Sequence, residues 1–116
     1  MTVIWNEWSG HLAPKMKSLH RTVGQYLRNG RHSHVMVGVT SNPERRWKER
    51  YRKEWDKMVV IYRTMSLEYA TRCEREIVAH FGHSRAQFES SWNTNPGGNG
   101  NFRSYGPYFI YLVLSS

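Results

Sequence analysis

Short apolar runs rich in β-branched side chains occur three times along the chain. They are HVMVGV at 34–39, MVVIY at 58–62 and YFIYLVL at 108–114. Runs of this length and composition, bounded by turn-forming residues, predict buried strands. Residues 1–13 include Trp5 and Trp8 but show no clear period, so the pattern assigns no element to them.

A longer spacing of apolar residues, three and four positions apart, predicts three helices. They run from Pro14 to Asn29, from Pro43 through Tyr51, and from Ser66 to Phe81. The second helix has Trp47 and Tyr51 on one face, and an extension that adds Trp55 to that face stays open. Asn42 is suited to cap the second helix, since its side chain can accept a backbone hydrogen bond. Gly82 is suited to end the third.

Three strands and three helices that do not alternate regularly predict an α+β fold, in which a small three-stranded sheet is flanked by helices. The length of 116 residues predicts a single domain, residues 1–116. A polar loop is expected between the third helix and the last strand. The connections leave the order of the strands open.

The chain is strongly basic: 17 Lys and Arg against 9 Asp and Glu give a formal net charge of +8. This favours a polyanionic partner, nucleic acid ahead of a membrane, although a protein that is merely basic is the alternative. The single cysteine, Cys73, excludes an internal disulfide and predicts an intracellular protein, cytoplasmic or nuclear. No apolar run approaches the roughly 18 residues of a membrane span, so no membrane partner is expected.

The third predicted helix carries one carboxylate on its apolar side. At about 100° per residue, Glu74 falls within the arc of apolar side chains of LEYATRCEREIVAHF, whereas Glu76 falls opposite. Burying an ionised carboxylate is costly unless it is paired or binds a metal. Two interpretations stay open: an ion pair with an arginine of the second helix, or a metal ligand in a cleft.

The second helix is dense in positive charge. Its basic residues are Arg45, Arg46, Lys48, Arg50, Arg52 and Lys53. Arginine can bind a phosphate through two parallel hydrogen bonds, so this helix suits a nucleic-acid backbone. The alternative is a solvated charged face, supported by neighbouring Glu44, Glu49 and Glu54.

A glycine-rich tract, NTNPGGNG, follows at 93–100. Its glycines permit close approach of the backbone to a ligand, and Asn93 and Asn95 offer amide groups. The alternative is an ordinary surface turn.

In this order the segments resemble the motifs of GIY-YIG nucleases, a family with excision-repair, homing and restriction endonucleases. Met36-Val37-Gly38 resembles the second strand motif, and Arg46 occupies the place of the catalytic arginine. Residues 74–81 resemble the E-x-x-L-I-x-x-F helix, and residues 93–100 resemble N-x-x-P-G-G-x-G. The match spans residues 34 to 100, and it implies a mainly antiparallel sheet.

The tyrosines depart from the family pattern. Met36 stands where the second motif tyrosine is expected, and Gly24-Gln25-Tyr26 imitates the first motif within a predicted helix. Residues 108–112, YFIYL, resemble the family's first strand, which suggests a circular permutation with Tyr111 as the first tyrosine and Tyr108 on the other sheet face. The permutation predicts that residues 108–113 lie beside residues 35–39.

The resemblance implies a metal-dependent endonuclease that hydrolyses phosphodiester bonds in DNA. Glu74 would hold a single Mg²⁺ or Mn²⁺, and Arg46 would bind the scissile phosphate. Tyr111, or alternatively Tyr26, would assist the attacking water. Asn93 would shape the substrate side of the site.

Further nucleic-acid contacts are expected from Arg45, Lys48, Arg50, Arg52, Lys53 and Asn95. Arg50 and Tyr51 are candidates for a supporting role. RNA is the alternative substrate, and the oligomeric state stays open, a dimer included. Two other classes of function compete with the nuclease: a non-catalytic nucleic-acid-binding module on a decayed nuclease fold, and a structural interaction domain.

Overall fold

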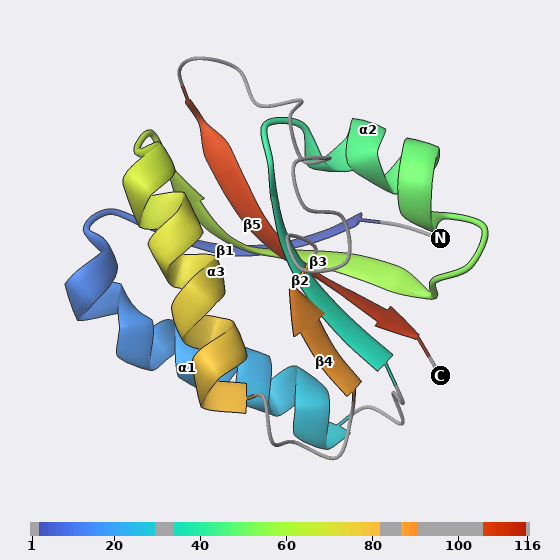
Figure 1. The fold of residues 1–116 in the computed structure, drawn as a ribbon, viewed down its shortest axis with the longest axis horizontal. Coiled ribbons are helices and arrows are strands. Elements are labelled where there is room, and N and C mark those ends of the chain that lie inside the picture. Colours follow the sequence, from blue (N-terminus) through green and yellow to red (C-terminus); the bar gives the residue numbers. More distant parts are fainter. Residues whose placement is uncertain (1–2, 30–33, 82–86, 91–105, 116) are drawn as a thin grey trace.

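The structure, a computed structural model, describes residues 3–29, 34–81, 87–90 and 106–115. The elements in chain order are β1 (Val3–Ser9), α1 (Leu12–Asn29), β2 (His34–Thr40), α2 (Pro43–Arg46), the π-helical turn η1 (Trp47–Tyr51), β3 (Lys57–Thr64), α3 (Leu67–Phe81), β4 (Gln87–Ser90) and β5 (Tyr108–Ser115) (Figure 1). The expected α+β class and the three predicted strands are confirmed. None of the helices in the described part of the chain is long and apolar enough to cross a membrane.

The strands form one mixed sheet in the order β1-β3-β5-β2-β4. β5 occupies the centre and runs antiparallel to both β2 and β3. The outer strands β1 and β4 run parallel to their neighbours β3 and β2. The expectation of a three-stranded, mainly antiparallel sheet is therefore wrong in strand count, and it holds only for the three central strands. The expected pairing of residues 108–113 with residues 35–39 is confirmed.

The sequence pattern does not predict either outer strand, and each omission has a physical reason. β1 lies at the sheet edge, with Trp5 and Trp8 exposed by 47% and 38%, and its register to β3 shifts between them. An exposed edge strand with a register shift shows neither clean alternation nor a continuous apolar run. β4 has only four residues, QFES, within the segment expected to be a polar loop. So short a polar sequence does not predict a strand without its pairing partner.

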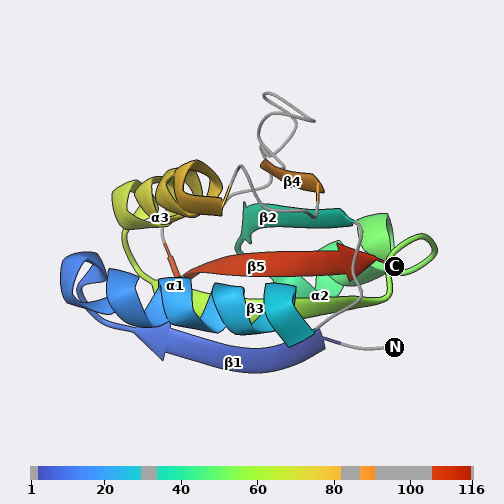
Figure 2. The same ribbon diagram turned by 90° about the horizontal axis from the view of Figure 1, so that it is seen from below.

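The two faces of the sheet carry separate apolar clusters. Figures 1 and 2 show α1 and α3 on one side of the sheet and α2 on the other. The α1/α3 cluster includes Leu19, Val23, Val35, Val37, Val39, Tyr62, Ile77, Tyr108, Ile110 and Leu112. The η1 cluster consists of Trp47, Tyr51, Met58, Tyr111 and Val113, with Val3, Met36 and Trp55 partly buried against it. Because successive side chains of a strand point to opposite faces, Tyr108 and Tyr111 belong to different clusters, as expected.

Four strands reach the same end of the sheet. β2 ends at Thr40 and β3 ends at Thr64, which pairs with Tyr108 at the start of β5. β1 ends there too, with Ser9 paired to Arg63. Since α1, α2 and α3 follow β1, β2 and β3, all three helices begin at this end.

Candidate functional site

The turn from β2 into α2 is built by side chains that cap the backbone. Thr40 Oγ1 accepts a hydrogen bond from the Asn42 N–H at 3.1 Å, and Asn42 Oδ1 accepts one from the Arg45 N–H at 3.1 Å. Pro43 stands at the start of the helix, where an amide donor is not needed. The predicted Asn42 cap is confirmed, and it starts the helix that carries Arg46.

Arg46 is buried. The residue is 4% exposed, and its Nη1 is buried without a hydrogen-bond partner among the residues that the structure describes. A buried donor left without an acceptor costs about 1–3 kcal/mol, and more when the group is charged. An oxyanion at this position would supply the missing acceptor through a charge-assisted hydrogen bond. Arg46 is therefore a candidate anion ligand.

The remaining basic side chains of this segment face solvent. The exposed residues are Arg45, Lys48, Arg50, Arg52 and Lys53. Arg45 Nε contacts Glu49 Oε2 at 3.0 Å, which is the neighbouring pair that the solvated-face interpretation expects. An exposed pair of this kind contributes only about 0.3–0.5 kcal/mol, so a phosphate can compete for the arginine.

The helix leaves α-helical geometry directly after Arg46. The Arg52 N–H donates to Trp47 O at 2.8 Å, five residues back, which is the π-helical pattern. Trp47 and Tyr51 are 4% and 5% exposed, and the expected burial of both on one side is confirmed. The prediction of a regular helix through Tyr51 is wrong in its hydrogen bonding, because apolar spacing does not distinguish a π turn from an α turn.

Two tyrosine hydroxyls meet beneath η1. Tyr51 Oη lies 2.8 Å from Tyr111 Oη and 3.8 Å from Met36 Sδ. Tyr111 pairs across the sheet with Gly38 and has 0% exposure, so any role at a substrate passes through a neighbouring group such as Tyr51. Sequence reasoning missed this hydroxyl pair. The available signal was that a tyrosine on the inward side of a helix needs a partner for its hydroxyl.

Tyr26, the alternative catalytic tyrosine, lies elsewhere. It is on α1, packed against the α1/α3 cluster. Its hydroxyl accepts a hydrogen bond from Asn6 Nδ2 at 3.4 Å, and Lys57 Nζ lies 5.7 Å from the centre of its ring. The structure therefore does not bring Tyr26 together with Tyr111, which lies in the η1 cluster on the opposite face.

Glu74 faces inward from α3, as the helix geometry predicts. It is 6% exposed and lies on the same helix side as Ala70 and Ile77, which are fully buried. Its helix covers the α1/α3 face, whereas Tyr111 belongs to the η1 face. Burial, with smaller contributions from Glu76 and Glu74, raises the pKa of the Cys73 thiol far above its usual range. The thiol therefore stays protonated, and we assign no chemistry to it.

Glu74 can serve a hard cation as a single carboxylate ligand. Within the described residues, no three His, Cys, Asp or Glu side chains are grouped so as to share a metal. Mg²⁺ is commonly held by one or two carboxylates, with water and phosphate oxygens completing its shell. The buried carboxylate of Glu74 fits that chemistry. Asn93 and Asn95, the remaining predicted site residues, lie outside the described residues.

Comparison of this chain with protein-family models, with curated proteins and with solved structures returned no match. Function is therefore inferred from the side chains themselves. The residues that matter are a buried arginine with one nitrogen that has no partner among the described residues, an inward carboxylate, and a pair of tyrosine hydroxyls.

Proposed function

We propose that the chain is a metal-dependent endonuclease that hydrolyses phosphodiester bonds in DNA, at the end of the sheet where β2 passes into α2. The observation that carries the proposal is Arg46, whose buried Nη1 lacks a partner in the described part of the chain. Packing alone does not favour burying an unpaired charge. The exposed basic residues that follow Arg46 make a nucleic-acid phosphate the anion that best suits it.

The strand pairing supports a circularly permuted GIY-YIG arrangement. β5, which resembles the first motif strand, lies antiparallel beside β2, which resembles the second. Tyr111 pairs with Gly38 in that ladder, and Arg46 follows on the next helix. The strand that opens the family's motif order thus has the neighbour that the family arrangement requires, although it comes last along the chain.

Each residue has one task in the proposed reaction. Arg46 binds the scissile phosphate and offsets the negative charge that develops on its oxygens. Tyr51, held by Tyr111 across their 2.8 Å contact, accepts a hydrogen bond from the attacking water and orients it toward phosphorus. The proton that this water loses passes through solvent to the oxygen that leaves phosphorus. Tyr51 in this way replaces the hydroxyl that is lost where Met36 stands. Mg²⁺ or Mn²⁺, when bound through Glu74, supplies Lewis-acid stabilisation of the phosphate oxygens.

Glu74 and the tyrosine pair approach the site from opposite sides of the sheet. The proposal therefore requires the scissile phosphate to lie at the end of the sheet, between the starts of α2 and α3. Arg46 stands at that end, since α2 begins three residues after β2. A substrate strand would cross the strand ends and would not lie along one face.

Nicking of supercoiled plasmid DNA in Mg²⁺ or Mn²⁺ tests this function. Arg46→Ala and Glu74→Ala should each lower the rate by about 100-fold or more, the usual cost of losing a group that stabilises the transition state. Arg45→Ala and Glu76→Ala are matched controls, because they remove the same charges from exposed neighbours. Arg45→Ala loses only one exposed phosphate contact and Glu76→Ala loses none, so both should lower the rate far less.

Binding of DNA by the Glu74→Ala protein should persist, because the substitution removes the metal ligand and no phosphate contact. The proposal fails if the wild-type protein cuts neither DNA nor RNA with either metal. It also fails if each control variant loses as much activity as its neighbour.

A non-catalytic nucleic-acid-binding module is the second candidate. Two observations favour it: Tyr111 is completely buried, and Met36 stands where the family motif has a tyrosine. This module would bind nucleic acid without cleavage, with a log–log salt slope of about −0.9 for each phosphate contact. Arg46→Ala would then weaken binding and reduce that slope by about 1.

A further inference from the structure

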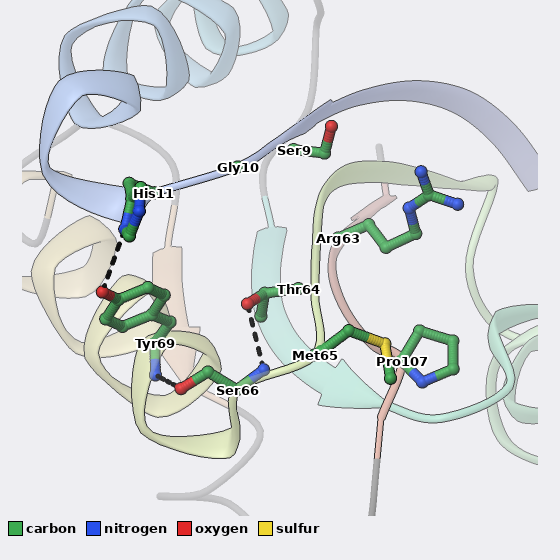
Figure 3. Close-up of a pocket in the computed structure, with 9 residues that line it drawn as sticks. All are labelled: Ser9, Gly10, His11, Arg63, Thr64, Met65, Ser66, Tyr69 and Pro107. Atoms are coloured by element: carbon green, nitrogen blue, oxygen red, sulfur yellow. Dashed lines mark hydrogen bonds between the residues drawn. The ribbon is translucent and has the colours of Figure 1, made fainter.

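A cavity of about 680 Å³ opens at the same end of the sheet. It lies between the turn from β1 into α1 and the turn from β3 into α3, with Pro107 on a third side (Figure 3). Neither Arg46, Glu74 nor the tyrosine pair lines it. Small-molecule sites typically enclose about 300–1,000 Å³, so this cavity is large enough for a nucleotide.

Close backbone contacts preform the cavity. Gly10, in the turn that lines it, has a φ of +99°, a left-handed conformation that favours glycine. A Cβ on Gly106 would lie 2.7 Å from Met65 Cα, so only glycine lets the backbone before Pro107 approach the β3–α3 turn this closely. Ser66 Oγ accepts a hydrogen bond from the Tyr69 N–H at 3.1 Å and fixes the start of α3.

One part of the cavity wall is aromatic and apolar. Tyr69, Met65 and Pro107 supply it (Figure 3). The Tyr69 ring is held in place because its hydroxyl lies 3.2 Å from His11 Nδ1, within hydrogen-bond distance. Stacking of a nucleic-acid base on an aromatic ring contributes about 1–3 kcal/mol and tolerates any base. Tyr69 therefore offers a stacking surface for a base.

Arg63 supplies a positive charge to the cavity. Its side chain is 51% exposed, and its Nε lies 3.9 Å from Glu7 Oε1. An exposed ion pair at this separation contributes at most about 1 kcal/mol. A phosphate can receive two parallel hydrogen bonds from the guanidinium and can displace Glu7.

The cavity and the turn from β2 into α2, which carries Arg46, are close enough to contact the same nucleic-acid strand. β3 and β2 are separated by β5 alone. Strands lie about 4.8 Å apart, so the ends of β3 and β2, at Thr64 and Thr40, are about 10 Å from each other. Along the axis of a duplex, the phosphates of one strand advance about 3.4 Å each, so this distance corresponds to about three base steps of a duplex that lies across the strand ends.

We infer, on the basis of the proposed function, that the cavity binds one unpaired nucleotide of the substrate strand, with its base on Tyr69 and its phosphate on Arg63. A base within a duplex cannot enter a side cavity without leaving the stack. The preferred substrate is therefore DNA with an unpaired segment close to the cleavage position, such as a flap, a gap or a bulge, ahead of continuous duplex.

Fluorescence anisotropy in EDTA, where no cleavage occurs, tests the inference. The probes are a labelled duplex of about 20 base pairs and the same duplex with a single-stranded flap of about four nucleotides. Each is long enough to cross the end of the sheet once. Wild-type protein should bind the flap DNA about tenfold more tightly. Arg63→Ala should lower flap affinity about tenfold, or about 1.4 kcal/mol, and change duplex affinity little.

Two further variants control for a general loss of charge or of folding. Arg72→Ala removes an exposed arginine from α3 outside the cavity, and it should affect both DNAs equally and weakly. Met65→Glu places a carboxylate at the cavity in an exposed residue, so it should weaken flap binding without disturbing the core. Equal losses on flap and duplex DNA, or no loss with Arg63→Ala, would overturn the inference.

The outcomes separate this inference from the nuclease proposal. If the wild-type protein nicks DNA but the cavity variants retain full preference for the flap, the cavity inference fails and the nuclease stands. If the protein never nicks but loses flap preference in Arg63→Ala, the cavity inference stands alone. If deoxyadenosine monophosphate binds at micromolar concentration and flap DNA does not displace it, the cavity serves a free nucleotide and the inference is wrong.

Discussion

The two faces of the sheet bury different kinds of side chain. The α1/α3 face is filled mainly by valine, leucine and isoleucine. The η1 face is smaller and is built from tryptophan, tyrosine and methionine around a pair of hydroxyls, beside the corner that carries the buried Arg46. Burial of apolar area accounts for the first face apart from the carboxylate of Glu74 on α3. It does not require hydroxyls or a charge at the second face. Polar groups kept at a cost in stability are the ones to test for function.

The largest expected effect on stability comes from the α1/α3 face. Leu19→Ala, at a fully buried position on α1, should lower the free energy of unfolding by about 2–5 kcal/mol, because it removes packed atoms and leaves a cavity. Leu67→Ala, at a 40% exposed position, is the control and should cost far less. Urea unfolding measures both. If Leu19→Ala also lowered nicking per folded molecule, the aliphatic packing around α1 would contribute to the reaction as well as to stability.

The tyrosine pair should show coupling that aliphatic packing does not. Tyr51→Phe leaves the buried Tyr111 hydroxyl without this partner and should cost about 1–3 kcal/mol. The double variant Tyr51→Phe/Tyr111→Phe should cost less than the sum of the single variants, with a coupling of at least about 0.5 kcal/mol. Additive losses in urea unfolding, or single variants with wild-type nicking rates, would remove the pair from the proposed reaction.

Arg46 should stabilise the protein only when an anion is bound. Arg46→Met removes a charge whose Nη1 lacks a partner within the described stretches of chain, so the free energy of unfolding without phosphate should stay equal or increase. Inorganic phosphate at ten times its Kd should stabilise the wild type by about 1.4 kcal/mol and should not stabilise the variant. Arg45→Met is the control that should keep the response. Phosphate stabilisation that survives in Arg46→Met would place the anion site elsewhere.

The smallest expected effect is a dependence of stability on pH, and it arises on the α1/α3 face. His20 stacks on His80 with ring centres 4.0 Å apart, and burial, followed by the charge of His80, lowers the pKa of His20 below its usual 6.5, with Glu76 opposing. The unfolded state therefore gains the proton first, so stability is full above pH 6.5 and decreases as the pH falls below it.

His20→Phe should remove part of this decrease, and His34→Gln, at an exposed histidine of β2, should leave it in place. Urea midpoints measured above and below pH 6.5 provide the comparison. An unchanged pH dependence in His20→Phe would show that the histidine stack does not couple protonation to folding.

Features with a local pattern could be predicted from the sequence. The β-branched runs identify β2, β3 and β5, and the 100° geometry of the third helix identifies Glu74 as inward. Asn42 and Pro43 identify the start of α2, because capping depends on neighbouring residues alone. Each of these signals lies within a few residues of the feature that it predicts.

Features that depend on distant residues could not be predicted. Tyr51 and Tyr111 are 60 residues apart, and only the central position of β5 brings their hydroxyls together. The cavity beside Arg63 takes its lining from four separate stretches of chain, so no single stretch indicates it. The residues of β1 lack the alternation that is typical of a strand. They are extended because they pair in parallel with β3.

The central position of β5 also determines when the sheet can be completed during synthesis. Among the described strands, β5 joins the β1–β3 pair to the β2–β4 pair, yet residues 108–115 are translated after both. A nascent chain therefore carries two unjoined ladders, and the long-range contacts that join them form slowly. Until Tyr111 is in place, Trp47 and Tyr51, which follow Arg46 in the chain, lack the sheet residue against which they pack. Under the proposed nuclease function, a ribosome-bound chain should therefore be unable to cut nucleic acid until residue 115 has left the exit tunnel.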